Sequence, residues 1–376
     1  MEKQFNPEQI IEEARQFTDV HIRPYAGEFD KNEALPRKLI QQMAAKGYLA
    51  AVFPCEYGGL GLDSITYGHL TEVIGKACCS TRTLLTVHTS LVGETLCRWG
   101  TRSQKERWLP AMAMGEKIAA FALSEPDQGS NAKGIQTQYV QKGDRYIING
   151  RKKWISFADI ADLFLVFASN EKAISAFMVE RDTGDIKTTP IKGLLGNRAA
   201  HIAEIEFNNV EVPEKNVIGR IGSGFTYVAS SALDNGRYSI AWAGVAIAQE
   251  ALDAMIRYSK HRKQFGAKLA SFQLIQGIIG DAVMKTHVAR AICEKAGKMK
   301  KEGDADAVIE TTVAKYFTSK VAMEVAIDAV QVHGGNGCID QYPVERLFRE
   351  AKILEIIEGT SQIQQSIISR FAINSY

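Results

Sequence analysis

Apolar residues recur with a different spacing in each of three successive parts of the chain. Up to about residue 115 the spacing is helical, and in the segment 7–23 the residues Ile10, Ala14 and Phe17 share one side. From about 119 to 222, short alternating or wholly apolar runs are separated by Gly, Asp, Asn and Pro, which is typical of strands joined by turns. Beyond about 224, long helical segments with short connections return, which is typical of an antiparallel bundle.

This order predicts an α+β multidomain protein. We expect a helical N-terminal domain over 1–118, a middle β domain, barrel or sandwich, over 119–223, and a C-terminal helical bundle over 224–376. The predicted helices are 7–23, 36–46, 63–76, 80–98, 103–113, 225–260, 271–300, 305–333, 344–358 and 361–373, and the predicted strands are 145–148, 163–168, 176–179 and 202–207. The predicted buried stripe of 305–333 is Val313, Phe317, Val321 and Val325.

Glu358 stands at a break between two apolar segments near the end of the chain. Gly359 can end the first helix in the left-handed cap position, and Thr360 can cap the second. The predicted buried positions are Ile353, Ile356 and Ile357 before the break and Ile363, Ile367, Ile368 and Phe371 after it. A carboxylate at such a break is either a general base with a raised pKa or a solvated glutamate, and the local pattern leaves both open.

Composition and charge exclude several classes of protein. The chain is 45% apolar and 23% charged with a net charge of +2, spread evenly, which favours neither nucleic acid nor a membrane surface as a partner. No apolar stretch is long enough to predict a membrane span. The cysteines show no metal-site spacing, so we expect no metal. Because the N-terminus lacks the apolar core of a signal peptide, we expect a cytoplasmic protein.

Six motifs in order resemble those of acyl-CoA dehydrogenases, a family of flavin enzymes. The resemblance spans essentially the whole chain, and its motifs lie at 54–61, 121–130, 153–156, 262–266, 331–335 and 358–360. It implies an N-terminal helical domain, a middle β domain and a C-terminal four-helix bundle, with FAD as the cofactor. Each motif alone is compatible with a plain turn or a buried strand, and their common order makes the resemblance specific.

The resemblance implies two groups of FAD contacts. The first group covers the isoalloxazine ring with fixed donors and flat apolar surface, and comprises Phe121, Leu123, Ser124, Trp154 and Ser156. The second group matches positions that reach the FAD of a neighbouring subunit, and comprises Arg262, Gln264, Phe265, Gln331, Gly334 and Gly335. Thr360 and Gln362 match a further FAD contact at a helix start. Shared sites imply a homo-oligomer, at least a dimer and in this family usually a tetramer.

The implied reaction is α,β-dehydrogenation of an acyl thioester. Glu358 matches the base that takes the α proton, its backbone N–H matches a donor to the thioester carbonyl, and flavin N5 accepts the β hydride. Some members carry the base at the position of Gly236, where this chain has no side chain to serve. The positions that match substrate contacts are Ser130, Asp234, Arg237 and Gly359. For Asp234 and Arg237, an ion pair on the helix surface is an equal alternative.

Some residues depart from the common family pattern. Ile357 stands where Tyr is frequent, and 127–131 reads Asp-Gln-Gly-Ser-Asn, which changes the pocket beside the thioester. The segments 79–80, 236–242 and 354–359 are similar to a subgroup from polyketide and nonribosomal antibiotic pathways. Its members oxidise groups carried by an acyl carrier protein, some of them hydroxylated units on the way to hydroxymalonyl extender units. The sequence therefore leaves acyl-CoA and acyl-carrier-protein thioesters open as substrates.

Two further alternatives concern the type of protein, and one more implication of the resemblance concerns its partner. An acyl-CoA oxidase is disfavoured because such chains are usually much longer than 376 residues. A non-catalytic flavoprotein that binds thioesters or DNA would be favoured by loss of Glu358 or by a strongly basic tail, and neither feature is present. The resemblance implies an electron-transfer flavoprotein as the electron acceptor.

Overall fold

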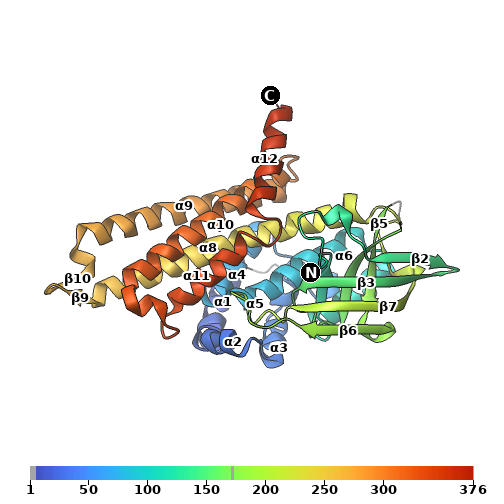
Figure 1. Ribbon diagram of the computed structural model, residues 1–376, viewed down its shortest axis with the longest axis horizontal. Helices are drawn as coiled ribbons and strands as arrows, with labels where there is room; N and C mark the ends of the chain where they lie inside the picture. The colour runs from blue at the N-terminus through green and yellow to red at the C-terminus, as the bar shows by residue number, and fades with distance from the viewer. Residues whose placement is uncertain (1–5, 171–172, 376) are drawn as a thin grey trace.

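The computed structural model describes residues 6–170 and 173–375, which form helices and one large β-sheet (Figure 1). The long C-terminal helices lie side by side at one end and the sheet lies at the other. The order helix, sheet, helix agrees with the order that the sequence predicts. Among the described residues, only the stretch Gly224–His261 is long and apolar enough to cross a membrane, and 83% of its most apolar window is buried inside the protein.

The N-terminal helices begin at side-chain caps that the sequence supplies. The backbone N–H of Thr66 donates to Asp63, and Thr101 and Gln104 form a reciprocal capping box. The helices are α1 Pro7–His21, α2 Ala26–Asn32, α3 Arg37–Ala45, α4 Ser64–Ala77, α5 Cys79–Leu84, α6 Glu94–Trp99 and α7 Arg102–Ala113. The helix predicted over 80–98 is not uniform, because Leu85–Gly93 is a wholly buried π-helix between α5 and α6. Such π-helical turns are frequent at functional sites.

The middle of the chain forms one eight-stranded mixed sheet. Its strands are β1 Ala119–Ala122, β2 Gln138–Lys142, β3 Arg145–Ile155, β4 Leu163–Ser169, β5 Ile174–Glu180, β6 Asp185–Pro190, β7 Ala203–Pro213 and β8 Val217–Ile218. The order is β6-β7-β3-β2-β4-β5-β8, with β1 beside β4. The four predicted strands are present. β1, β2, β6 and β8 were not predicted. β2 and β6 carry no apolar alternation because most of their positions are exposed, and β1 and β8 are only four and two residues long.

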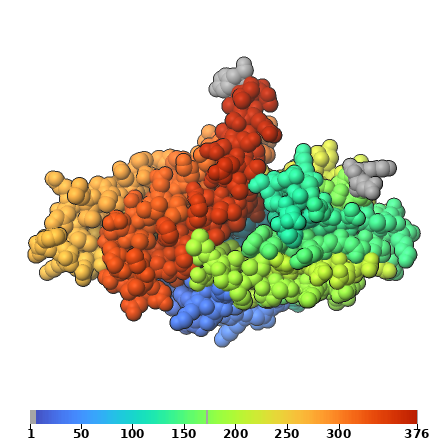
Figure 2. All heavy atoms as spheres, in the orientation of Figure 1, coloured from blue at the N-terminus to red at the C-terminus, as the bar shows by residue number. Residues whose placement is uncertain are grey.

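The C-terminal part of the chain is a bundle of helices in which α8 is the most buried. They are α8 Ser230–His261, α9 Gln273–Glu302, α10 Ala307–His333, α11 Pro343–Leu354 and α12 Ser361–Ser375, and a small hairpin of β9 Lys263–Gln264 and β10 Ala267–Lys268 joins α8 to α9. The hairpin lies at the extreme end of the bundle (Figure 1). α12 projects away from the rest of the chain (Figures 1 and 2).

The buried face of α10 differs from the predicted stripe. Val321 and Val325 are buried, but Val313 and Phe317 are only half-buried. The fully buried positions around them are mostly small, namely Ala314, Thr318, Ser319, Ala322 and Ala326. Small residues face α8 because the two backbones approach closely: a Cβ at Gly244 would lie 2.6 Å from the carbonyl oxygen of Thr318.

Two predictions about the end of the chain are wrong in detail. α11 ends at Leu354, so Gly359 does not cap it and belongs to a separate turn, although its φ of +89° is left-handed as expected. Ile356 is 52% exposed and Phe371 is 42% exposed, so neither is a buried position of this chain. The expected Thr360 cap is present, since the backbone N–H of Ile363 donates to Thr360 Oγ1 at 3.3 Å.

Candidate active site

Glu358 lies in a strained turn between α11 and α12. Its φ is +54°, a left-handed conformation that glutamate adopts at a cost of about 1 kcal/mol or more. The buried Gln364 side chain holds the turn by donating Nε2 to the carbonyls of Glu358 and Gly359, at 3.0 and 2.9 Å. A Cβ at Gly359 would lie 2.7 Å from that same nitrogen. Gly359 is thus required by its backbone conformation and by the side chain that fixes the turn.

The Glu358 carboxylate points at Gly236 on α8. A Cβ at Gly236 would lie 2.5 Å from Glu358 Oε2 and 2.7 Å from Leu91, so only glycine leaves room for this carboxylate. Oε2 is buried and has no hydrogen-bond partner among the described residues. Burial raises the pKa of Glu358 to about 7, against the opposing effects of Arg237, Lys315 and Arg82. A buried, unpartnered carboxylate that titrates near neutrality has the properties of a general base.

Two of the three cations near Glu358 were not singled out by the sequence. Lys315 on α10 is fully buried, donates Nζ to the carbonyl of Gly359 at 2.7 Å, and has its pKa lowered to about 8, chiefly by burial. Arg82 on α5 is fully buried and donates Nη1 to the carbonyl of Ser239 at 2.9 Å. Lys315 and Arg82 each lie within a run of otherwise apolar or hydroxyl-bearing residues. A charged residue in such a run is unusual, and this feature of the sequence could have identified both as candidate site residues.

Arg237 and Asp234 do not form the ion pair that was considered for them. Asp234 pairs with Lys300 on α9, and the charge of Glu358 acts on Arg237 more strongly than that of Asp234. The Nε atom of Arg237 is buried and has no hydrogen-bond partner in the described part of the chain, and burial lowers the pKa of this arginine. Arg237 therefore belongs to the Glu358 cluster, and Asp234 joins α8 to α9 beside it.

The residues predicted to cover the flavin ring lie at the carboxyl ends of β1 and β3, which the hydrogen bond from the Lys153 N–H to the Ser124 carbonyl brings together. Phe121 and Leu123 are buried in the core, so any cofactor contact from them comes from their backbone. Ser124 and Ser156 are half-buried, and Trp154 is 53% exposed with a left-handed φ of +64°. A large aromatic ring held in a strained, open position is suited to cover a flat ligand.

A buried ion pair ties the two halves of this wall together. Lys152 Nζ donates to Glu125 Oε1 at 2.8 Å and to the carbonyl of Leu123 at 3.0 Å, while the backbone N–H of Lys153 donates to the carbonyl of Ser124. Glu125 also accepts from the backbone N–H of Thr137 at 2.9 Å. The pair fixes the loop after β1 against β3, and its two members were not predicted as site residues.

The remaining predicted residues divide between two places. Ser130 is exposed on the loop after β1, and Thr360 and Gln362 begin α12 beside Glu358. The other six lie at the far end of the bundle, namely Arg262, Gln264, Phe265, Gln331, Gly334 and Gly335. His333 stacks on Tyr258 with ring centroids 4.1 Å apart, which brings the end of α10 to the hairpin after α8. One chain therefore does not bring all its predicted cofactor contacts together.

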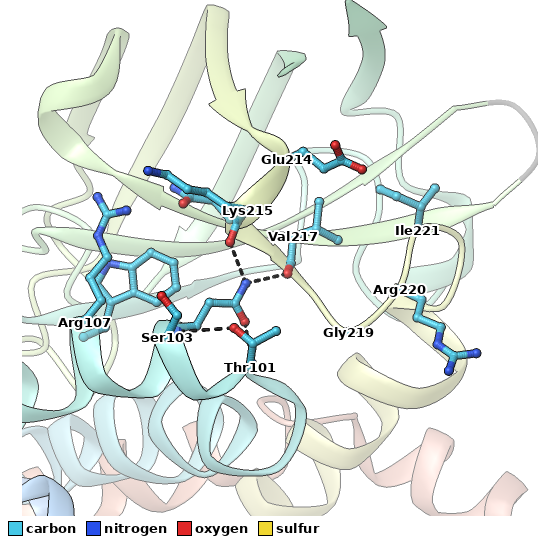
Figure 3. A pocket seen from close by; sticks show the side chains of 12 residues that line it. Thr101, Ser103, Arg107, Glu214, Lys215, Val217, Gly219, Arg220 and Ile221 are labelled. Atoms are coloured by element: carbon cyan, nitrogen blue, oxygen red, sulfur yellow. Dashed lines mark hydrogen bonds between the residues drawn. The ribbon is translucent and has the colours of Figure 1, made fainter. Parts of the chain in front are cut away.

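A recess elsewhere in the chain has a structural role. It has a volume of about 450 Å³ and lies between the start of α7 and the connection from β7 to β8 (Figure 3). Gln104 Nε2 donates to the carbonyls of Lys215 and Val217, both at 2.8 Å, and so joins the helices to the sheet. None of the residues predicted to bind cofactor or substrate lines it. The candidate active site is therefore the Glu358 cluster, which holds a carboxylate with a raised pKa beside buried cations. Among the described residues, no group of three or more His, Cys, Asp or Glu side chains is placed to hold a metal.

Comparison with known proteins covers nearly the whole chain. Family models described as the N-terminal, middle and C-terminal domains of acyl-CoA dehydrogenase match residues 6–116, 120–210 and 222–373. The short-chain-specific acyl-CoA dehydrogenase of Clostridium acetobutylicum is 37% identical over 96% of both chains. The human mitochondrial short-chain-specific acyl-CoA dehydrogenase is 35% identical over 98% of this chain and 90% of its own.

Solved structures agree with these sequence matches. Butyryl-CoA dehydrogenase from Megasphaera elsdenii superposes with a TM-score of 0.95 and 32% identity, over 99% of this chain and 100% of its own. A chain from a structure titled for the electron transferring flavoprotein of Acidaminococcus fermentans has a TM-score of 0.95 and 37% identity, over 99% of both chains. FkbI, titled for biosynthesis of a methoxymalonyl extender unit, has a TM-score of 0.89 and 29% identity, over 97% of this chain and 99% of its own.

The buried pair of Lys152 and Glu125 gives a stability prediction. Replacing Lys152 by Met leaves the Glu125 carboxylate buried without its cation, so Lys152→Met is expected to lower the free energy of unfolding by about 3–5 kcal/mol. Lys153 forms a half-exposed pair with Glu204, and Lys153→Met is expected to cost about 0–1 kcal/mol. Urea denaturation of both variants, followed by circular dichroism, measures the difference. Equal losses in the two variants would contradict the role given to Lys152.

Proposed function

The chain belongs to the acyl-CoA dehydrogenase family, and from this premise we propose that Glu358 removes the α proton of a short acyl thioester. The enzyme is an FAD-dependent oxidoreductase that acts on CH–CH bonds. When bound, FAD supplies the acceptor for the hydride that leaves the β carbon. The observation that carries the proposal is the Glu358 side chain, whose Oε2 atom is buried without a hydrogen-bond partner among the described residues and which is held in a strained turn with its pKa raised to about 7.

The residues of the chain fit FAD at two surfaces. Trp154 and Ser156 line an open wall close to the core strand β1, where a flat ring can be covered. Gly334 and Gly335 have open space where a Cβ would stand, and Gly334 has φ +58° and ψ −139°, a conformation that is essentially restricted to glycine. A pyrophosphate can approach such backbone closely, and Arg262 on the nearby hairpin supplies a cation.

Glu358 also supplies a hydrogen-bond donor for the thioester carbonyl. Within residues 6–170 and 173–375, its backbone N–H donates to no protein acceptor. The α C–H of a thioester becomes acidic only when donors stabilise the negative charge that develops on the carbonyl oxygen. Lys315 fixes the adjacent peptide by binding the Gly359 carbonyl, so the N–H of Glu358 is held in place before the substrate binds.

Replacement of Glu358 by its isostere tests the assignment of the base. Glu358→Gln is expected to retain bound FAD, but the rate of flavin bleaching by butyryl-CoA should fall by a factor of about 10² or more, because the amide accepts no proton.

The pH dependence of the wild type is a second test. Its kcat/KM should rise about tenfold per pH unit below pH 7 and level off above it, since Glu358 acts only when deprotonated. Anaerobic stopped-flow spectroscopy measures both.

Glu355→Gln is the matched control for this test. Glu355 lies in the same turn, but its carboxylate pairs with Lys352 at 2.7 Å and does not face Gly236, so its variant should keep most of the wild-type activity. Bleaching at the wild-type rate by Glu358→Gln would show that another group takes the proton.

We also propose that two chains share each FAD. Gly236, which faces Glu358, and His261, which precedes the hairpin, are about 25 residues apart on α8 and therefore about 38 Å apart. One dinucleotide does not span that distance, so the hairpin and the end of α10 serve a second chain. Phe265 is 95% exposed and Leu274 is 86% exposed, as expected of residues that a neighbour covers. This arrangement requires at least a dimer, and a tetramer is the usual assembly of the family.

A mixed oligomer tests the shared site. Arg262→Glu and Glu358→Gln chains are each expected to be inactive alone, but a hybrid that contains both has one site built from two unaltered halves. Purification of the hybrid through two different affinity tags should recover about half of the wild-type activity per chain. A hybrid no more active than its parents would show that each chain binds its own FAD.

A coenzyme A thioester is the proposed substrate, because the most similar curated relatives are named for short-chain acyl-CoA. An acyl-carrier-protein thioester is the second candidate, favoured by the similarity to FkbI and to AnaB, a prolyl acyl carrier protein oxidase. The same acyl group offered on coenzyme A and on a carrier protein separates the two candidates. A kcat/KM at least tenfold higher for the carrier-protein form would favour a role in a biosynthetic pathway that uses carrier proteins.

We also propose an electron-transferring flavoprotein as the electron acceptor and the cytoplasm as the compartment.

A further inference from the structure

His88 is a fully buried histidine whose two ring nitrogens both have backbone partners. The backbone N–H of Ala119 donates to Nδ1 at 3.1 Å, so Nδ1 carries no proton. Nε2 therefore carries the proton and donates to the carbonyl of Met112, at 3.2 Å. Burial lowers the pKa of His88 to about 4, which agrees with a neutral ring. The ring is thus fixed in one tautomer and joins two segments that are remote from it in the sequence.

The two partners of His88 lie on either side of the connection from the N-terminal helices to the sheet. Met112 is in the last turn of α7, and Ala119 is the first residue of β1. Among the described strands, β1 pairs only with β4. The carbonyl of Ile118 accepts from the N–H of Leu163 on β4, so the N–H of the same peptide, which belongs to Ala119, points away from β4. His88 satisfies this N–H at the edge of β1 that has no strand beside it.

β1 leads directly into the wall that is proposed to cover the flavin. Phe121 lies within the strand, and Leu123 and Ser124 follow it. The far end of this wall is held to β3, because the N–H of Lys153 donates to the carbonyl of Ser124 at 3.0 Å. Its near end is held to the helices through His88. A change at His88 therefore alters the position of the wall relative to the helices.

His88 lies on the π-helix Leu85–Gly93, and the next turn of this helix reaches Glu358. An added Cβ at Gly236 would lie 2.5 Å from Glu358 Oε2 and 2.7 Å from Leu91 Cδ2, so the carboxylate and Leu91 meet at that point. The π-helix is held to α8 as well, through the hydroxyls of Thr86 and Ser239 at 2.7 Å. One short helix thus contacts both the base and the start of the flavin wall.

We propose that His88 is a positioning residue of the dehydrogenation: it holds the first residue of β1 against the π-helix and so determines how far the flavin wall stands from Glu358. This inference rests on the proposed function and adds a residue to the same site. One acyl chain must lose its α proton to Glu358 and its β hydride to the flavin, so both sides must be placed at once. A displacement of about 1 Å can lower the rate of such a step about 100-fold.

Three variants separate the two hydrogen bonds of His88. His88→Asn keeps an acceptor near the place of Nδ1, His88→Gln keeps a donor near the place of Nε2, and His88→Leu keeps neither. The rate of flavin reduction by butyryl-CoA per bound FAD is expected to fall about 100-fold in His88→Leu and in His88→Gln. His88→Asn should restore most of the rate, because it can still accept from Ala119. KM should change little in all three, since no atom that binds the thioester is removed.

Two further measurements do not depend on turnover. The visible absorption spectrum of bound FAD depends on the surroundings of the ring, so it should differ from that of the wild type in His88→Leu and resemble it in His88→Asn. The dissociation constant of FAD, followed by the fluorescence of the released flavin, should rise in the same order. Anaerobic stopped-flow spectroscopy measures the rate of reduction.

His201→Asn is the matched control for a purely structural effect. His201 also joins the N-terminal helices to the middle domain, since its Nε2 accepts from the N–H of Leu35 at 3.0 Å and its Nδ1 lies 3.3 Å from Asp159. It belongs neither to β1 nor to the π-helix. Its variant is expected to lower the urea midpoint of unfolding, as the His88 variants do, but to keep the flavin spectrum and the rate of reduction per bound FAD.

Each remaining outcome counts against a different statement. Reduction at the wild-type rate by FAD-loaded His88→Leu, with an unchanged spectrum, would show that His88 only stabilises the fold. If His88→Leu does not fold, equal rates in His88→Asn and His88→Gln would overturn the inference, because these two variants keep different bonds. If butyryl-CoA and other short acyl thioesters fail to bleach the wild-type flavin, the proposed function is wrong. The spectrum and the dissociation constant of FAD then still decide whether His88 holds the flavin wall.

Discussion

α8 is packed so closely against its neighbours that glycine stands at the contact in each direction. Gly244 leaves room for the backbone of α10, and Gly236 leaves room for the Glu358 carboxylate. From α4, Gly68 and Gly75 meet Trp242 and Ala246. An added Cβ would overlap the Thr318 backbone at Gly244 and the Trp242 ring at Gly68, and side-chain atoms at Gly236 and Gly75. Close-packed interiors do not absorb such overlaps. The position of Glu358 therefore depends on how closely the helices approach α8.

The electrostatics of the site follow from that packing. Arg82, Arg237 and Lys315 arrive from three different helices and surround one carboxylate, yet burial still raises the pKa of Glu358 to about 7. The cations keep the carboxylate from becoming a permanently protonated acid, and the lack of a direct hydrogen bond to Oε2 keeps it basic. The unsatisfied nitrogens of Arg82 and Arg237 are the unfavourable part of this arrangement, and such groups concentrate where a ligand completes them.

The length of α8 separates the chain into two functional ends. One end carries the base and the wall with Trp154, and the other carries an exposed hairpin and two glycines with open space around them. α12 projects from the rest of the chain (Figure 2), and its Phe371 and Ile373, like Phe265 in the hairpin, are exposed. The proposed sharing of each cofactor between chains would cover such side chains and supply the contacts that one chain keeps apart.

The sequence alone determined the order of helices and strands, the family and the residue proposed as the base, because periodicity, turn residues and ordered motifs are local properties of the chain. The strands β2 and β6 were missed, since exposed strands carry no apolar alternation, and the buried stripe of α10 was misplaced, since small residues at a close helix contact outweigh larger apolar ones. Only the tertiary structure showed that the charges of Lys315 and Arg82 act on Glu358, that Asp234 pairs with Lys300, and that Lys152 and Glu125 hold the loop after β1 against β3. These relations join residues far apart in the chain, and their energies depend on burial and distance, which the order of residues does not encode locally.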